Sequence, residues 1–245
     1  DLAGVRFSAT KTRIDGRTYG EYALLCRRLP DVLQSTYAGW DLGTDGREAW
    51  EGFARSGAFL MEERRVDGGA IGFQFARLDG GAVAQAVDLA PGETRVLDFV
   101  LCWYFPHLLS PGLPTVDYGH AYQNWFGSAL EAGRAVLAEA DQLRARTLRW
   151  QEALTASNLP GWLVRKLGND LGVLFTNSWY TRDYRFTMNE SPTYMRGCSG
   201  TLDQRMAAGG IFAMCFPGLG ASELRDWAAQ QRSEEHTSEL QSRHN

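Results

Sequence analysis

Short runs of alternating apolar and polar residues, separated by turn residues, occur throughout the first hundred residues of the chain. Three of these runs are clear, at residues 22–26, 70–76 and 82–87. Asp-Gly and Gly-Gly steps mark turns, at residues 15–16, 45–46, 67–69 and 79–81. Period-two alternation predicts half-buried strands, and strands spaced by about ten residues are typical of an antiparallel β-sandwich. We therefore expect a β-sandwich domain over residues 1–115, incomplete at its start.

Two features refine this first domain. Pro91-Gly92 is a turn signal between two apolar runs, and the second run continues into Cys102-Trp103-Tyr104-Phe105-Pro106. This arrangement predicts two strands joined by a Pro-Gly turn. Residues 46–59 interrupt the strand pattern because Trp50 and Phe53 stand at helical spacing, and they predict a short inserted helix.

The apolar period changes after residues 111–114, which read Pro-Gly-Leu-Pro. From about residue 118 to residue 154, apolar positions recur at steps of three and four. This spacing predicts one long amphipathic helix or two helices in tandem. We assign residues 116–156 to this connecting helix.

Further helices are expected over residues 157–231. Ser157-Asn158-Leu159-Pro160 has the composition of a helix cap with proline in the first turn. Apolar residues at helical spacing predict three helices after it, around residues 162–174, 202–216 and 221–231. Residues 177–201 are expected to form a loop between the first two of these helices.

Residues 232–242 differ in character from the helix before them. They read RSEEHTSELQS, are polar, and have no apolar period that continues the preceding helix. The segment resembles the translation of a common sequencing-library adapter. We therefore expect residues 232–245 to be a non-native tail and leave them out of the fold prediction.

Composition narrows the possible functions. The 245 residues are 44% hydrophobic and 12% aromatic, enough for a globular core, and no apolar run is long enough to span a membrane. A formal net charge of −4 gives no basic surface for nucleic acid. The cysteines lie far apart, at positions 26, 102, 198 and 215. Their spacing favours buried free thiols over a zinc site or disulfides, and free thiols favour a cytoplasmic location.

Three stretches, taken in order, resemble glycoside hydrolase family 116, the β-glucosidase and non-lysosomal glucosylceramidase family. The first is Phe99 to Pro106, similar to the last strand of that family's N-terminal domain. The second runs from Tyr122-Gln123-Asn124-Trp125-Phe126 to Ser157-Asn158-Leu159-Pro160-Gly161-Trp162. The third contains Asn177-Ser178-Trp179-Tyr180, Glu190-Ser191-Pro192, Gly200-Thr201-Leu202-Asp203 and Phe216-Pro217. The resemblance implies a β-sandwich followed by the first helices of an (α/α)6 six-hairpin barrel.

The resemblance also implies site residues. Glu190 matches the family's nucleophile, although a solvent-exposed loop glutamate is the alternative interpretation. Asp203 matches a residue that hydrogen-bonds sugar hydroxyls, and as a helix N-cap it would serve structure instead. Thr201 is a further candidate for sugar contacts, and Trp179 and Tyr180 are candidates for an aromatic stacking wall, with core packing as the alternative for Trp179.

A retaining glycosidase needs two carboxyl groups about 5–5.5 Å apart, one as nucleophile and one as acid/base. In the family the acid/base is an aspartate further along the barrel, so we expect this chain alone to be inactive. No cofactor is implied, and the expected substrate is a carbohydrate or glycolipid with a β-linked glucose. Two alternatives stay open: another six-hairpin glycosidase or phosphorylase, and a non-catalytic carbohydrate-binding sandwich.

Overall fold

The computed structural model describes residues 2–9, 20–41, 45–59, 79–109, 116–191, 195–199 and 202–242. The chain forms two compact units, which are described separately. Unit 1 consists of Asp1–Pro106 and Trp125–Thr147, and unit 2 consists of His107–Asn124 and Leu148–Asn245.

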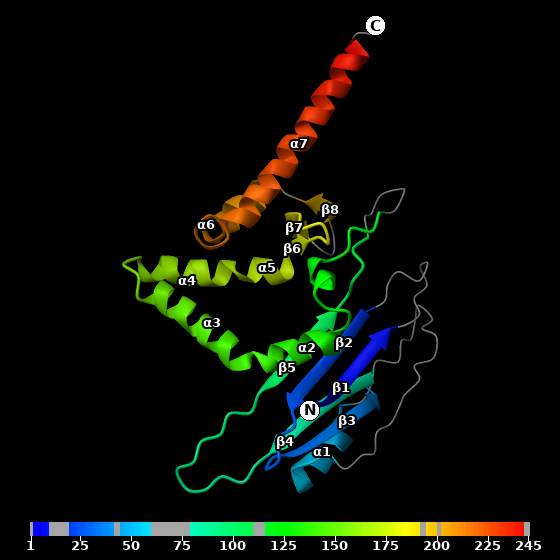
Figure 1. The fold of residues 1–245 in the computed structure, drawn as a ribbon, viewed down its shortest axis with the longest axis vertical. Coiled ribbons are helices and arrows are strands. Elements are labelled where there is room, and N and C mark those ends of the chain that lie inside the picture. The colour runs from blue at the N-terminus through cyan, green and yellow to red at the C-terminus, as the bar shows by residue number, and fades with distance from the viewer. Residues whose placement is uncertain are drawn as a thin grey trace. The chain divides into compact units, whose positions relative to one another are not determined.

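Unit 1 contains two antiparallel sheets (Figure 1). The first has the order β1-β2-β5, with strands Leu2–Ala9, Gly20–Arg27 and Phe99–Tyr104. The second pairs β3 (Leu33–Asp41) with β4 (Asp79–Ala86). A Cβ placed on Gly81 of β4 would lie 2.6 Å from Phe7 and 3.1 Å from Val5 of β1, so the two sheets touch. The predicted antiparallel sheets, with strands at 22–26 and 82–87, are confirmed; the run at 70–76 lies outside the described residues.

The Pro91-Gly92 turn forms as predicted, but the two elements around it do not form a hairpin. Gly92 has a φ of 81°, and the amide of Glu93 donates to the carbonyl of Ala90 over 2.9 Å. The preceding strand, β4, pairs with β3, whereas the following strand, β5, pairs with β2. The turn therefore lies on a crossover between the two sheets. Tertiary packing, and not the turn, determines which strands pair.

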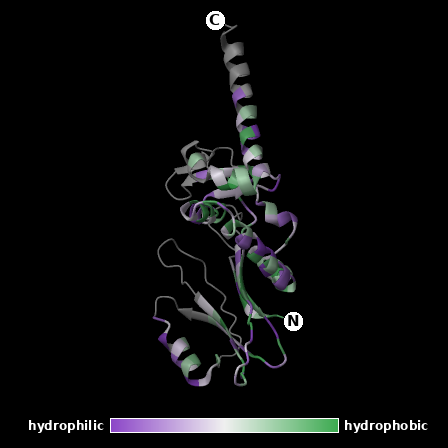
Figure 2. Ribbon diagram, turned by 90° about the vertical axis from the view of Figure 1, so that its left-hand side faces the viewer, coloured by the Kyte–Doolittle hydropathy of each residue, from purple (hydrophilic) through white to green (hydrophobic). Residues whose placement is uncertain are grey.

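The inserted helix is confirmed as α1 (Arg47–Ser56). Left-handed glycines flank it, Gly46 with a φ of 68° and Gly57 with a φ of 69°, a conformation that glycine adopts without a Cβ clash. The ring of Phe53 stacks on that of Phe59 at a centroid distance of 5.2 Å. Many positions of α1 are hydrophilic (Figure 2), as expected of an exposed helix.

The connecting segment contains two tandem helices, α2 (Ala129–Ala138) and α3 (Ala140–Thr155), after the short 3₁₀ helix η1 (Ala121–Asn124). Ser128 caps α2 by accepting the amide of Glu131 over 3.1 Å. The carboxylate of Glu131 in turn accepts the amide of Gly127 over 2.7 Å. A Cβ on Gly133 would lie 2.5 Å from Leu25 and 3.2 Å from the sulfur of Cys102. The backbone of α2 thus lies directly against β2 and β5.

Unit 2 surrounds a small sheet with helices. Its helices are α4 (Gly161–Asp170), α5 (Gly172–Thr176), α6 (Leu202–Cys215) and α7 (Pro217–Ser242). The sheet has the order β6-β7-β8, with strands Ser178–Tyr180, Phe186–Ser191 and Met195–Ser199. Its core is formed by Leu167, Phe186, Met188, Ile211 and Phe212. The helix predicted over 202–216 is confirmed as α6.

The prediction of a loop over residues 177–201 is wrong, because β6, β7 and β8 form an antiparallel sheet there. These strands are short, and no glycine or proline marks the turn between β6 and β7, so the sequence carries only a weak strand signal. The strands form because Phe186 and Met188 enter the core of unit 2. Tertiary burial therefore decides the conformation of this segment.

The last helix, α7, begins at Pro217 and includes the predicted helix over residues 221–231. Its backbone continues as a helix to Ser242, so residues 232–242 extend α7. Glu, Gln and Leu are good helix formers, and no glycine or proline interrupts them. The non-native origin of residues 232–245 stays a prediction. None of the helices in the described part of the chain combines the length and the apolar character that a membrane span needs.

Candidate functional site

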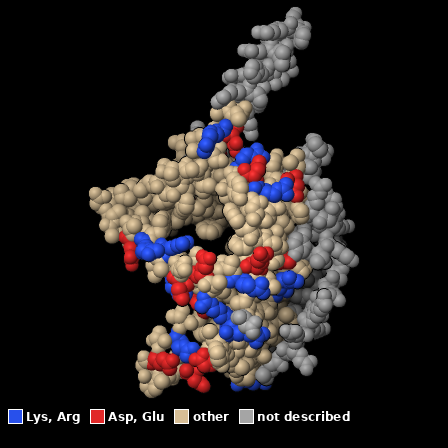
Figure 3. All heavy atoms as spheres, in the orientation of Figure 1, with Lys and Arg blue, Asp and Glu red and all other residues tan. Residues whose placement is uncertain are grey.

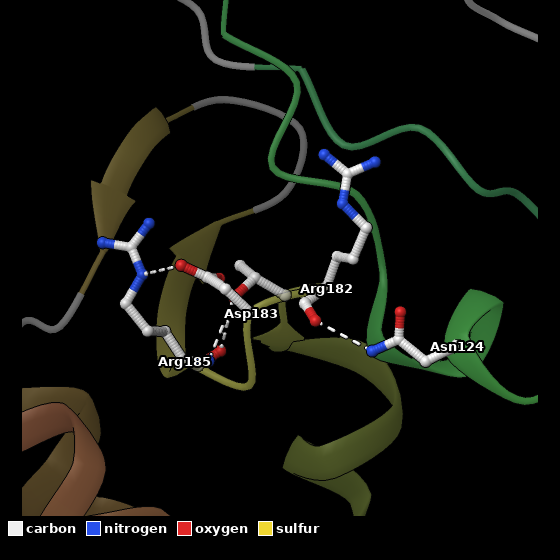
Figure 4. Close-up of polar contacts among 5 residues, drawn as sticks. Asn124, Arg182, Asp183 and Arg185 are labelled. Atoms are coloured by element: carbon white, nitrogen blue, oxygen red, sulfur yellow. Dashed lines mark hydrogen bonds and ion pairs between the residues drawn. The ribbon is translucent and has the colours of Figure 1, made fainter.

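The turn between β6 and β7, residues 181–185, is held by a dense set of polar contacts (Figure 4). Thr181 exchanges backbone and side-chain hydrogen bonds with Arg185: its amide donates to the Arg185 carbonyl over 2.9 Å, and its hydroxyl accepts the Arg185 amide over 3.1 Å. Tyr184 has a φ of 62°, the one non-glycine positive φ among the described residues. A tyrosine in this region is strained and persists only where surrounding contacts fix the backbone.

Asp183 is the electrostatic centre of this turn. Its carboxylate accepts hydrogen bonds from the Thr181 hydroxyl over 2.5 Å and from Nε of Arg185 over 2.9 Å. The Thr181 hydroxyl lowers the pKa of Asp183 below its ordinary value, outweighing the opposing effect of burial, and the charge of Arg185 lowers it further. The Arg185 guanidinium also lies over the ring of Tyr118, 5.6 Å from its centroid.

The turn is tied to the segment that precedes η1. The amide of Arg182 is shared between the carbonyls of Tyr118 and Gly119, each 3.2 Å away. The carbonyl of Arg182 accepts the side-chain amide of Asn124 over 2.8 Å, while the Arg182 side chain extends away from this contact (Figure 4). The segment before η1 and Asn124 of η1 therefore anchor the β6–β7 turn from outside the sheet.

Strand β7 is held from both sides. The carboxylate of Glu223 in α7 accepts the amide of Met188 over 2.8 Å and the hydroxyl of Thr187 over 3.3 Å. From the other side, the Asn189 amide donates to the Asn177 carbonyl over 2.7 Å, and the Asn177 side chain donates to the Asn189 carbonyl over 3.2 Å. Asn189 is 1% exposed, and within the described residues its Oδ1 has no hydrogen-bond partner.

His107 and Asp117 form a pair, with Nδ1 and Oδ2 separated by 2.6 Å. The other carboxylate oxygen of Asp117 accepts the amides of Leu108 and Gly119 over 3.1 and 3.0 Å. Burial acts to raise the pKa of Asp117, but these hydrogen bonds and the His107 charge lower it overall. Nearby, burial lowers the pKa of His120, partly offset by the charge of Asp117.

Trp179 and Tyr180 lie on β6, both half-buried. Tyr180 pairs with Phe186 and packs against the core, whereas Trp179 pairs with Thr187. Because side chains alternate across a strand, Trp179 occupies the face opposite the core. Of the two predicted stacking residues, Tyr180 therefore has the core-packing position, and Trp179 shares a face with Thr187, whose hydroxyl contacts Glu223 of α7.

Glu190 lies in β7 and not in a loop as predicted. Asn189 pairs with Ser199 and Ser191 pairs with Met195, so Glu190 alone faces residues 196–198 of β8. The ladder is thus irregular at Glu190, and such bulges often lie next to active sites. For Glu190 the structure therefore gives the place of the backbone in β7.

Asp203 is the second residue of α6, in its first turn. Aspartate is in general a favourable residue in the first turn of a helix, because the free amides and the helix dipole there attract negative charge. Thr201 lies outside the described residues. The structure thus brings Trp179, Tyr180 and the backbone of Glu190 into one sheet, with Asp203 on the next helix along the chain.

Charges of both signs mix on the surface shown in Figure 3, where Lys and Arg lie beside Asp and Glu. Arg95 with Asp31, at 2.6 Å, is one such pair in unit 1. Among the residues that the structure describes, no group of three or more His, Cys, Asp or Glu side chains is placed to hold a metal ion. The polar residues described above contact one another and the backbone.

Comparison with known proteins identifies the class of protein to which the chain belongs. A family model matches residues 1–146, which contain both sheets of unit 1, α1, α2 and the start of α3. This match identifies the N-terminal part of the chain as a domain of a glycoside hydrolase. The model is described as beta-glucosidase 2, glycosyl-hydrolase family 116 N-term, and the chain belongs to glycosyl-hydrolase family 116. The search of curated proteins gave no match.

Several residues of the site had no signal in the sequence. Glu223 is separated from Met188 by 35 positions, and no local pattern connects them. His107 and Asp117 are ten residues apart, and their pairing depends on how the chain returns at Leu109 and Asp117, which form an isolated bridge. A polar turn over 181–185 was detectable in principle from its Asp and Arg residues.

Proposed function

We propose that this chain is part of a retaining β-glucosidase and that Glu190 is its nucleophile. The observation that carries the proposal is the family match over residues 1–146, followed along the same chain by Glu190 at an irregular position of β7. The family match supports glycosidase chemistry, and the position of Glu190 supports a role beyond strand pairing. In this proposal, helices α4 to α7 belong to the start of a six-hairpin barrel.

In the proposed reaction the Glu190 carboxylate attacks the anomeric carbon, and the bond to the leaving oxygen breaks. The glycosyl-enzyme is then hydrolysed by water with retained configuration. By the family resemblance, an aspartate further along the barrel donates the proton to the leaving group and later accepts one from water.

The remaining predicted residues receive substrate-binding roles in this proposal. Asp203 and Thr201 hydrogen-bond the hydroxyls of the glucose unit. Trp179 stacks on a sugar ring; it is half-buried and lies outside the core cluster of unit 2. The role of Tyr180 is weaker, because that side chain packs against the core of unit 2. The substrate is a β-linked glucoside, either an oligosaccharide or a glycolipid.

The test uses the full-length enzyme that contains this chain and a 2-deoxy-2-fluoro-β-glucoside with a dinitrophenyl leaving group. This leaving group departs without a general acid, so the adduct reports the nucleophile alone. Peptide mass spectrometry should place the label on Glu190, and the E190Q variant should remain unlabelled. An active enzyme labelled at another residue would remove the assignment, and an active enzyme without any label would favour an inverting or phosphorolytic member of the six-hairpin class.

A further inference from the structure

Glu223 is a buried carboxylate that contacts the strand of the candidate nucleophile. Glu223 lies in α7 and is 1% exposed. Its Oε1 accepts the amide of Met188 over 2.8 Å. The same oxygen accepts the hydroxyl of Thr187 over 3.3 Å. A buried carboxylate is costly unless hydrogen bonds replace its water, so a glutamate at this place requires a reason.

The amide of Met188 is held by Glu223 shortly before the irregular part of β7. Two residues further, at Glu190, the β7–β8 ladder loses its regular register. Pairing with β8 therefore does not fix the backbone at Glu190 as a continuous ladder would. The nearest firm contacts are those of Glu223 with Met188 and of Asn177 with Asn189.

An apolar side chain in place of Glu223 would fit this position less well. An apolar side chain at position 223 would leave the buried Met188 amide without this acceptor, at a cost of about 1–3 kcal/mol. Glu223 thus joins α7 to β7 by a contact of defined length.

We propose that Glu223 is a positioning residue, which holds β7 so that Glu190 stands at a fixed place relative to the helices that would bind the sugar. The inference rests on the proposed role of Glu190. Glu223 acts through the backbone of Met188 and touches no substrate. Length matters more than charge in this role, because the carboxylate oxygen must reach the amide.

The experiment compares E223D, which keeps the charge and shortens the side chain, with E223Q, which keeps the length and removes the charge. Glu152→Ala, on an exposed face of α3, is the matched control. In the full-length enzyme, the rate constant for labelling by the dinitrophenyl fluoroglucoside and its inhibition constant are measured separately, on protein whose folding is verified by its Tm.

E223D is expected to label about 10–100-fold more slowly at saturating reagent, because a misplacement of about 1 Å at a reacting group costs up to 10²-fold. E223Q should lose less, and the inhibition constant should change little in either variant. A structural role alone would lower Tm and leave the rate constant of folded enzyme unchanged.

The possible results distinguish a failure of the proposed function from a failure of the positioning role. Labelling of the unmodified enzyme at a residue other than Glu190 rejects the proposed function, before the variants are compared. Labelling at Glu190 with E223D as fast as the unmodified enzyme overturns the positioning role. Slower labelling by E223Q than by E223D also overturns it, since charge and not length would then be the requirement.

Discussion

The carboxylate of Glu21 in β2 accepts the amide of Ala129, the first residue of α2, over 2.9 Å. Both residues are buried, Glu21 at 2% exposure and Ala129 at 0%. At the other end of the helix, the Arg27 side chain donates to the carbonyl of Leu137. A negative group at the helix start and a positive group near its end both complement the helix dipole. One strand therefore fixes α2 on the sheet at both ends.

The hydrogen bond from Ala129 to Glu21 predicts that Glu21→Ala destabilises the chain. Removing the carboxylate leaves the buried Ala129 amide without this acceptor, so the free energy of unfolding should fall by about 1–3 kcal/mol. Glu21→Gln keeps an acceptor oxygen and should lose less. Urea denaturation of the chain measures both, and Glu152→Ala should stay within about 0.5 kcal/mol of the unmodified chain. Equal losses for the alanine changes at positions 21 and 152 would contradict the interpretation.

Two helical glycines should respond to alanine with opposite signs. At Gly133 a new Cβ would lie 2.5 Å from Leu25, so overpacking of the core should lower stability by about 1 kcal/mol or more. At Gly168, inside α4, nothing lies within 4 Å, and alanine should stabilise by about 0.5–1 kcal/mol through helix propensity. Denaturation midpoints of the two variants compare them directly. A stabilising G133A would mean that α2 does not lie against β2 as closely as described.

His120 predicts a pH dependence of stability. Burial lowers its pKa below the ordinary value of 6.5, although Asp117 opposes this effect. The unfolded chain therefore binds a proton at a pH where the folded chain does not, and stability falls as the pH drops below about 6.5. The fall ends once the pH is below the pKa of the folded state.

The measurement is Tm at pH 7.5 and at pH 5.5 for the unmodified chain and for His120→Phe. Phenylalanine keeps a ring to stack on Tyr122, whose centroid is 5.2 Å from that of His120. The variant should show a smaller drop in Tm between the two pH values. An equal drop would assign the pH dependence to other groups.

Tyr184 predicts how the β6–β7 turn responds to substitution. Its φ of 62° is tolerated by asparagine but strongly disfavoured for a β-branched residue. Tyr184→Val should therefore be less stable than Tyr184→Asn by about 1–2 kcal/mol. Both variants lose the contact with the Tyr180 ring, 5.8 Å away, so their difference isolates the backbone. Equal stability in thermal unfolding would argue against the left-handed conformation.

Elements with a strong local signal were predictable. The strand at 22–26 alternates, and α1 is bounded by Gly46 and Gly57, so local preference and structure agree there. The family was also accessible from ordered motifs, and the match over residues 1–146 agrees with it. Among the candidate site residues, Trp179 and Tyr180 do lie in the same sheet as Glu190.

Elements whose conformation depends on distant partners were not predictable. Residues 178–191 have a weak strand signal, and they form β6 and β7 because Phe186 and Met188 are buried against Ile211 and Phe212. Likewise, the Pro91-Gly92 turn indicated two strands, but their partners lie in different sheets.

The sequence by itself determined the strands at 22–26 and 82–87, the helices α1 and α6, the Pro91-Gly92 turn, and the family, because each depends on neighbouring residues or on an ordered set of motifs. The tertiary structure alone decided which strand each strand pairs with, that Glu190 lies at an irregular point of β7, and that Glu21 and Glu223 bind distant backbone amides. These contacts join residues 35 and 108 positions apart. Their energy comes from burial in a core that exists only once the chain has folded.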